Sequence, residues 1–330
     1  LYILPHITSL EQSGTAAAPS ATQLFRPAPL FRQARSAYPT AAEPVRPNFL
    51  FNLASEPSGP AQLEILDANG QEIRKQALDA HTGLNGAYWD LLYDAPTLVQ
   101  LRTTPPENPH IWEEPRFQGK TIRTITHWGI TPTTGIPLAA PGSYQVRLTV
   151  DGKTYTQPLE VLKDPAVEAS DATLRASTAM QVRIRGDITE TSQMVNQMEI
   201  WRKQIEDQLR SDSPADGTAL HRLNDQILEV EHQLVSEASM LSDDKYFPEA
   251  YKVYMNLIWL SGGVGQGASD EAGGVDDAPT ATQDRVLAKI EGQLAAARTG
   301  FQGLKTATLP AFNRSMAGKA AAITDAISNR

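Results

Sequence analysis

The chain has 330 residues, 41% of them hydrophobic and 20% charged, so it can bury ordinary cores and is long enough for two or three domains. Its net charge of −9, with Lys and Arg scattered along the chain, argues against nucleic acid or an anionic membrane as the main partner. The absence of cysteine excludes disulfides, Cys-ligated zinc, iron–sulfur clusters and Cys nucleophiles. No apolar run approaches the ~20 residues of a membrane span, so we expect none.

Residues 1–47 are expected to form one short strand, at 1–4, and then a linker rich in Ala, Pro, Ser and Thr. The prolines between residues 27 and 47 deny this linker both helix and central-strand structure. Because the first residues have the pattern of the middle of a strand, we expect either a segment of a longer polypeptide or a boundary chosen for expression.

Residues 48–163 are expected to fold as a β-domain. The expected strands are 48–54, 62–66, 71–78, 86–93, 121–128 and the two arms of a hairpin within 141–161. A proline-rich excursion, residues 94–120, interrupts them. About seven short strands separated by turns are typical of an immunoglobulin-like or fibronectin-like β-sandwich of about 100 residues.

The hairpin carries the clearest pattern in the chain. Asp151-Gly152 at its centre supplies the positive φ angles that a type I′ turn requires. The strand period of two places one set of apolar side chains on a single face: Tyr144, Val146, Leu148 and Val150.

Residues 164–330 are expected to be helical, because apolar residues there recur at intervals of three and four. The expected helices are about 171–210, 218–241, 248–260 and 282–308, the last with a break or kink at Pro310 and a continuation to 327. A Gly/Asp-rich loop at 261–279 is expected to be mobile. The predicted fold class is therefore α+β and multidomain, a β-sandwich followed by an antiparallel helical bundle.

Motifs of this chain resemble the C-terminal region of bacterial BNR-repeat proteins, the sortilin-like or "glycosyl hydrolase-like" β-propellers. The resemblance lies in Asn85-Gly86-Ala87-Tyr88-Trp89-Asp90-Leu91, in Ile136-Pro137-Leu138-Ala139-Ala140-Pro141-Gly142-Ser143-Tyr144, and in the hairpin that follows. That family continues into a helical region near a Lys-x-Asp-Pro segment, similar to Lys163-Asp164-Pro165. The resemblance implies a supporting tail, with the propeller in a preceding part of the protein.

The start of the chain is similar to the last propeller strand of that family, at residues 1–4 and 7–10. The sequence departs from the family at Pro5-His6, where an acidic pair usually stands. No Asp-box repeat of the type Ser-x-Asp-x-Gly-x-x-Trp occurs in the 330 residues, so any active site of such a propeller would lie outside this chain.

The sequence carries no catalytic, cofactor-binding or metal-binding pattern. Glu113 and Glu114 are adjacent in an extended segment, so they point to opposite sides and make a poor acid–nucleophile pair. Asp90 is expected to bond a neighbouring backbone amide or an Arg. The histidines lack any metal-ligand spacing and are expected at the surface: His6, His81, His110, His127, His221 and His232. The stretch from Gly263 to Gly267 lacks the preceding strand and following helix of a phosphate loop. We therefore expect no cofactor.

One candidate interaction surface lies in the proline-rich excursion. Its residues are His110, Trp112, Arg116 and Phe117. A Trp beside an Arg is typical of a contact hot spot. Three roles stay open for Trp112: docking on the parent's propeller, which we favour, a lid over the sandwich, or contact with carbohydrate. The other tryptophans are expected in cores: Trp89 and Trp128 in the sandwich, Trp201 and Trp259 in the bundle.

The sequence thus predicts a non-catalytic scaffold and interaction portion of a secreted or periplasmic β-propeller protein. Its partner would be the propeller of the same parent or of a separate chain, or another protein or glycan ligand. The alternative is an accessory part of a glycoside hydrolase or other hydrolase whose active site lies upstream, with the sandwich as a carbohydrate-binding module.

Overall fold

The structure, a computed structural model, describes residues 21–32, 47–126, 136–211, 217–241, 249–265 and 276–327. It is an α+β fold that divides into two compact units. Unit 1 comprises residues 1–95, 136–181 and 264–279, and unit 2 comprises residues 96–135, 182–263 and 280–330. The expected strand at 1–4, most of the 1–47 linker, Trp128 and most of the 261–279 loop lie outside the described residues.

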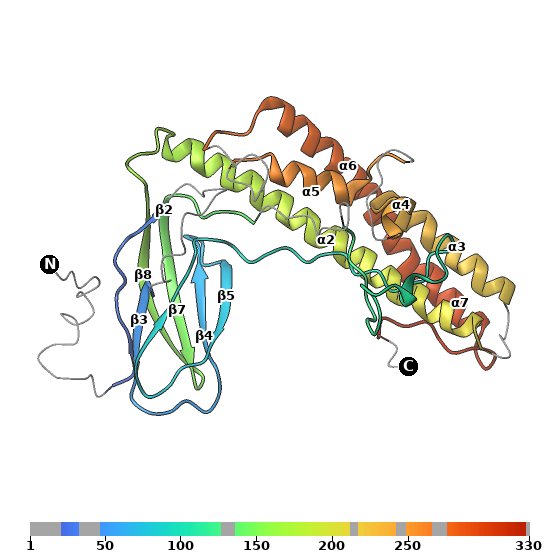
Figure 1. The fold of residues 1–330 in the computed structure, drawn as a ribbon, viewed down its shortest axis with the longest axis horizontal. Helices are drawn as coiled ribbons and strands as arrows, with labels where there is room; N and C mark the ends of the chain where they lie inside the picture. The colour runs from blue at the N-terminus through green and yellow to red at the C-terminus, as the bar shows by residue number, and fades with distance from the viewer. Residues whose placement is uncertain are drawn as a thin grey trace, which may run out of the picture. The chain divides into compact units, whose positions relative to one another are not determined.

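Unit 1 contains the strands, which form two sheets (Figure 1). In chain order the strands are β1 (Gln23–Leu24), β2 (Leu30–Arg32), β3 (Phe49–Leu53), β4 (Ala61–Leu66), β5 (Glu72–Leu78), β6 (Gly83–Ala87), β7 (Gly142–Val150) and β8 (Lys153–Lys163). One sheet has the order β1-β3-β6 and the other β2-β8-β7-β4-β5. All pairs are antiparallel except β2 and β8, which run parallel.

The hairpin β7–β8 forms as the sequence predicts. Its turn residues Asp151 and Gly152 have φ angles of 48° and 75°, the left-handed values that a type I′ turn needs. Tyr144, Val146, Leu148 and Val150 are all buried, which confirms the predicted face. The pattern was readable because turn chemistry and period both act within one short segment.

One hydrophobic core in unit 1 takes side chains from both sheets. Phe49, Phe51 and Leu53 of β3 contribute to it together with residues of β4, β7 and β8. Trp89 packs edge-to-face on Tyr144, with 5.9 Å between the ring centroids. This core holds the hairpin against the second sheet.

The predicted strand at 86–93 is wrong beyond Ala87, where β6 ends. Leu91 has a φ of 63°, so the chain bends sharply here. The indole Nε1 of Trp89 donates to the carbonyl of Leu92 at 2.8 Å, and the Asp90 carboxylate accepts from the Leu92 amide at 3.0 Å. Trp89 is therefore a core residue, as expected, but in a bend, and Asp90 bonds a backbone amide as expected.

The helices, in chain order, are α2 (Asp171–Leu209), α3 (Gly217–Leu234), α4 (Glu237–Met240), α5 (Val253–Gly262), α6 (Ala281–Gly303) and α7 (Leu309–Ser315). The expected helix at 218–241 is interrupted because Ser236 caps a new start, its hydroxyl accepting from the Ser239 amide. The helix does not break at Pro310: α6 continues through a π-helical turn, η2 (Leu304–Thr308), into α7, which has Pro310 in its first turn. The expected continuation to 327 is wrong, because α7 ends at Ser315.

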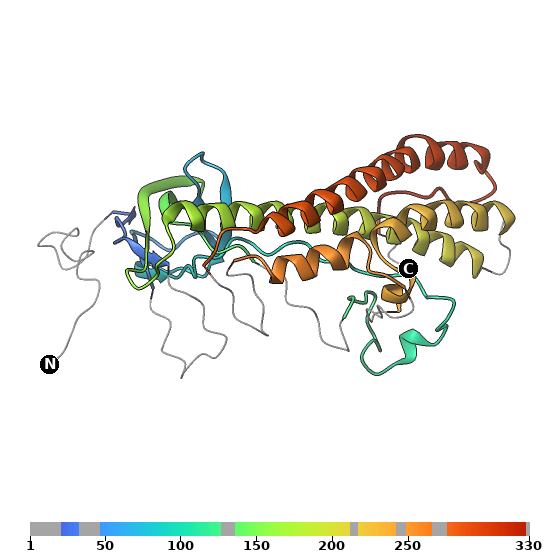
Figure 2. The same cartoon turned by 90° about the horizontal axis from the view of Figure 1, so that it is seen from above.

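In unit 2, α3 and α6 lie side by side in both views (Figures 1 and 2). The predicted apolar face of α3 is buried: Leu220, Leu223, Ile227, Val230 and Leu234. Gly300 of α6 permits the close approach, since a Cβ there would stand 3.1 Å from a methyl of Val230. Trp201 of α2 stacks on Phe301 of α6 at 5.4 Å, which confirms its predicted core position.

Two ion pairs fix the relative direction of α2 and α6 in unit 2. Arg183 Nη2 lies 2.8 Å from Glu291, and Arg298 pairs with Glu190 through both carboxylate oxygens. Both pairs join residues 108 positions apart, so residue numbers rise together along the two helices. This pair of helices is parallel, unlike the antiparallel neighbours that the sequence predicts, because the chain returns through α3 and α5 between them.

Candidate functional site

A strap of extended chain, residues 97–104, lies along α2 in unit 2. From residue 97 to 104 an extended chain advances about 23 Å, and from residue 189 to 206 an α-helix advances about 25 Å. The two lengths match, so side chains of α2 can hydrogen-bond the strap over its whole length. The predicted strand at 121–128 is not formed within the described residues to 126; Arg123 makes one isolated bridge, with Leu101 of the strap.

Each α2 side chain that hydrogen-bonds the strap forms what we call a rung, and the first two rungs are uncharged. Thr189 Oγ1 accepts from the amide of Thr97 at 3.3 Å. One helical interval of seven residues further on, the Asn196 side chain accepts from the Gln100 amide at 2.6 Å and donates to the Leu98 carbonyl at 3.1 Å. Side chains of a helix thus satisfy backbone groups that a neighbouring strand would otherwise satisfy.

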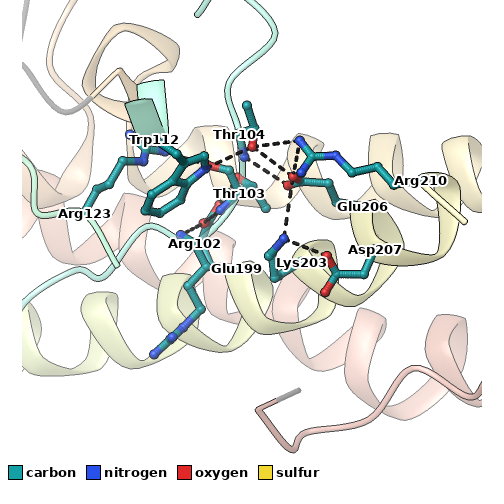
Figure 3. A network of polar contacts seen from close by, with 10 residues as sticks. All are labelled: Arg102, Thr103, Thr104, Trp112, Arg123, Glu199, Lys203, Glu206, Asp207 and Arg210. Carbon is teal, nitrogen blue, oxygen red and sulfur yellow. Dashed lines mark hydrogen bonds and ion pairs between the residues drawn. The ribbon is translucent and has the colours of Figure 1, made fainter. Parts of the chain in front are cut away.

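The last two rungs are carboxylates, each holding one threonine twice (Figure 3). Glu199 accepts from the Thr103 amide and hydroxyl, both at 2.8 Å, and also from the Arg102 amide. Glu206 accepts from the Thr104 amide at 3.0 Å and from its hydroxyl at 2.9 Å. Hydrogen bonds to ionised acceptors are the stronger kind, so these rungs carry most of the attachment.

Behind the strap, Glu199 shares a guanidinium with a second carboxylate. Arg202 Nη1 lies 2.7 Å from Glu199 and 2.9 Å from Glu231 of α3, and both carboxylates have no exposed surface. Burial acts to raise the pKa of Glu199, but the charge of Arg202 and the amide donors outweigh burial and lower it. Burial raises the pKa of Glu231 to about 8, because Arg202 offsets only part of the penalty and Glu199 adds to it.

A second buried guanidinium holds the loop that follows the strap, which we call the Trp112 loop (residues 105–120). Arg123 donates to the carbonyls of Thr103 and Met240 at 2.7 and 2.8 Å. It also lies over the ring of Trp112, 5.3 Å from its centroid. Burial lowers the pKa of Arg123 to about 10, above neutrality, so it stays charged.

The structure brings the four predicted surface residues together, but in different environments. Trp112 is half-buried, and its Nε1 donates to Thr104 Oγ1 at 3.0 Å (Figure 3). Phe117 is buried and packs edge-to-face on Trp112 at 6.5 Å. Arg116 lies over Phe117, and His110 is exposed and bonded to Glu113 at 2.9 Å. The aromatic side chains of this loop are therefore covered, while most of its charged side chains are exposed.

The other residues weighed from the sequence have structural surroundings. Glu113 is exposed and Glu114 pairs with Arg116 at 2.8 Å, as a solvated loop would have them. His81 and His221 are exposed, whereas His232 is half-buried, contrary to the expected surface position. His6 and His127 lie outside the described residues.

The predicted core position of Trp259 is wrong. This residue of α5 is 41% exposed and stacks on Tyr251 at 6.4 Å. No sequence pattern distinguishes the outward face of α5, because this helix is apolar on nearly every side.

Sequence reasoning missed Glu199, Arg202 and Glu231, although a pattern for one of them exists. Glu231 stands four residues after Ile227 and three before Leu234, a position on the apolar face of α3. A charged residue at such a position needs a buried partner. Which partner it takes depends on the pairing of α3 with α2, which the sequence pattern does not determine.

Within the described ranges, no group of three or more His, Asp or Glu side chains is arranged to hold a metal ion. None of the described helices combines the length and apolar character needed to cross a membrane. No protein-family model, curated protein or solved structure matches this chain. Chemically, the buried carboxylates and guanidinium groups around the strap act as ligands for the chain's own backbone.

Proposed function

We propose that this chain is a non-catalytic scaffold and interaction module, whose Trp112 loop offers a protein-binding surface. The observation that carries the proposal is that the polar groups gathered in unit 2 are engaged with the chain itself. Glu199 and Glu206 hold strap amides, and Arg123 holds a strap carbonyl. Such an arrangement orders a loop for docking and leaves few of these polar groups available to react with a substrate.

The Trp112 loop suits a protein partner better than a sugar. Stacking on a sugar ring needs an open indole face, whereas the indole of Trp112 is half-buried and has Arg123 over its ring. The groups that reach solvent include the imidazole of His110, 75% exposed, the carboxylate of Glu113, 74% exposed, and the guanidinium of Arg116, 46% exposed. A partner that presents charges of both signs would complement them.

The finer architecture belongs to the same proposal. Two sheets with one shared core support an immunoglobulin-like or fibronectin-like sandwich, and the packing of α3 and α6 supports a helical bundle. The motif resemblance at residues 85–91 and 136–144 supports a supporting tail in a secreted or periplasmic β-propeller protein. The partner would then be that propeller, on the same parent or on a separate chain.

The test is a binding titration of this chain against the region encoded upstream of Leu1, expressed separately. We expect the double variant H110A/R116A to weaken binding at least about tenfold, a loss of about 1.4 kcal/mol. R222A, which removes an exposed arginine on α3, is the matched control and should bind as the unaltered chain. Equal binding by all three proteins, or hydrolysis of a polysaccharide panel by this chain alone, would overturn the proposal.

A further inference from the structure

The Glu199–Arg202–Glu231 cluster has an imbalance of charge. Two carboxylates and one guanidinium are buried together, with side-chain exposures of 0%, 0% and 7%. A single nitrogen, Arg202 Nη1, reaches both carboxylates, while Arg202 Nε donates to Asn224 at 3.2 Å. If all three groups were ionised, one net negative charge would lie in a dry site, which is strongly unfavourable.

The hydrogen bonds of the cluster show the same imbalance. Glu199 already accepts from Arg202, from two strap amides and from the Thr103 hydroxyl. Glu231 Oε2 accepts from Arg202, but its other oxygen, Oε1, is buried without a donor among the described residues. Two carboxylates cannot bond each other unless one carries a proton. A proton on Glu231 supplies that donor, and its hydrogen bond with Glu199 contributes to the raised pKa of Glu231.

Among the residues that the structure describes, no neighbour supplies the missing positive charge. The ionisable groups acting on the cluster, or on His232 beside it, are Arg102, Glu107, Arg123, Glu206, His232, Glu249 and Lys252. Burial and the charge of Arg202 lower the pKa of His232, so this imidazole stays neutral near pH 7. Glu206 adds negative charge, already shared with Arg210 at 2.7 Å and the Thr104 donors. Two nearby arginines bond other partners: Arg102 of the strap bonds Gln100, and Arg123 bonds two carbonyls.

We propose that the cluster is a one-proton latch on the strap, closed while Glu231 is protonated and opened by its deprotonation. In the closed state one proton lets Glu199 keep Arg202 and the strap donors together. When the proton leaves, the two carboxylates repel each other and compete for Arg202, so Glu199 releases the amides of Arg102 and Thr103. The latch would therefore control how firmly unit 2 holds the Trp112 loop, a regulation that the proposed scaffold role alone does not require.

Amide hydrogen exchange on the full chain, followed by mass spectrometry, tests the latch. Protection of the strap peptide, corrected for intrinsic exchange at each pH, should fall by up to about tenfold for each pH unit between the ordinary pKa of glutamate and about 8, and should level off above that value. Protection of the β7–β8 hairpin in unit 1 serves as the internal reference and should stay constant. A strap protection that is flat from about pH 6 to about pH 9.5 would overturn the proposal.

Two variants separate the latch from general alkaline loosening. E231Q keeps a neutral donor at the same place, so its strap should stay protected across the whole range. E229Q changes an exposed glutamate of the same helix and should keep the pH dependence of the unaltered chain. An identical pH dependence in E231Q and in the unaltered chain would refute the role of Glu231.

A measurement on the unaltered chain stands independently of whether E231Q folds. Infrared spectroscopy with isotope-labelled glutamate should show the band of a protonated carboxylic acid at neutral pH. That band should be lost around pH 8, where the fall in strap protection levels off. Absence of the band at neutral pH, or its loss well below the pH at which protection levels off, would overturn the latch.

Discussion

Replacing Arg202 with methionine should destabilise the protein strongly, and by an amount that depends on pH. Methionine fills a similar volume but removes the guanidinium nitrogen that lies within ion-pair distance of both Glu199 and Glu231. Removing one partner of a buried ion pair costs about 3–5 kcal/mol, because a charge stays buried without compensation. We expect R202M to lose a free energy of unfolding in this range at neutral pH.

The pH dependence follows from the sign of the pKa change. In the unaltered protein Arg202 lowers the pKa of Glu199, so this group stabilises the fold above its unfolded pKa and less as the pH falls. Without Arg202 both carboxyls prefer to be protonated in the folded state, so folding of R202M takes up protons. The deficit of R202M should therefore shrink as the pH falls towards the unfolded pKa of glutamate, by about 1.4 kcal/mol per pH unit for each proton taken up.

Urea unfolding at a series of pH values, monitored by far-UV circular dichroism, measures this deficit. K203M removes a partly exposed cation one position along α2 and is the matched control; we expect it to lose less than about 1 kcal/mol. A deficit of R202M below about 1 kcal/mol at neutral pH, or one that grows as the pH falls, would refute the buried-charge reasoning.

Three further outcomes are expected. Thr103→Val removes the hydroxyl that donates to Glu199 and should cost about 1.5–3 kcal/mol in urea unfolding; a loss below about 0.5 kcal/mol would contradict a charged, buried hydrogen bond. Gly186→Ala, in the interior of α2 with open space around a new Cβ, should stabilise by about 0.5–1 kcal/mol, whereas Gly265→Ala should destabilise because φ is +55° and the Cβ would overlap a serine hydroxyl; thermal melts of the two variants should move in opposite directions. Burial raises the pKa of Asp187 to about 6, so its contribution to stability is lost as the pH rises through that value; Asp187→Asn should gain stability relative to the unaltered chain between about pH 4 and about pH 7, and a constant difference would exclude a raised pKa.

Local chemistry made part of the fold predictable. The β7–β8 hairpin follows from Asp151-Gly152 and a period of two, and the buried face of α3 follows from its apolar spacing. The strap did not follow from any pattern, because its amides bond side chains of α2 that stand more than 90 positions away in sequence. An extended segment whose backbone bonds helix side chains, rather than a neighbouring strand, need not alternate apolar and polar residues.

The candidate site, like the fold, was predictable only where the pattern is local in sequence. The composition of the Trp112 loop suggested a contact surface, but only tertiary structure shows that Phe117 is buried and that the Trp112 indole is engaged. The central charged cluster was not predicted because Glu199 and Arg202, taken alone on a helix, resemble ordinary surface charges, and the position of Glu231 on the apolar face of α3 does not identify its partner. Its meaning arises only when α2 and α3 bring two carboxylates to one guanidinium.

The two ion pairs between α2 and α6 also affect the register of these two helices. Along α2 the charges run positive then negative, at Arg183 and Glu190, and along α6 they run negative then positive, at Glu291 and Arg298. Sliding one helix by seven residues would set Arg183 against Arg298 or Glu190 against Glu291. Each exposed pair contributes little to stability, yet the alternation makes either one-heptad misalignment repulsive. Four surface charges thus disfavour a shift of register in both directions.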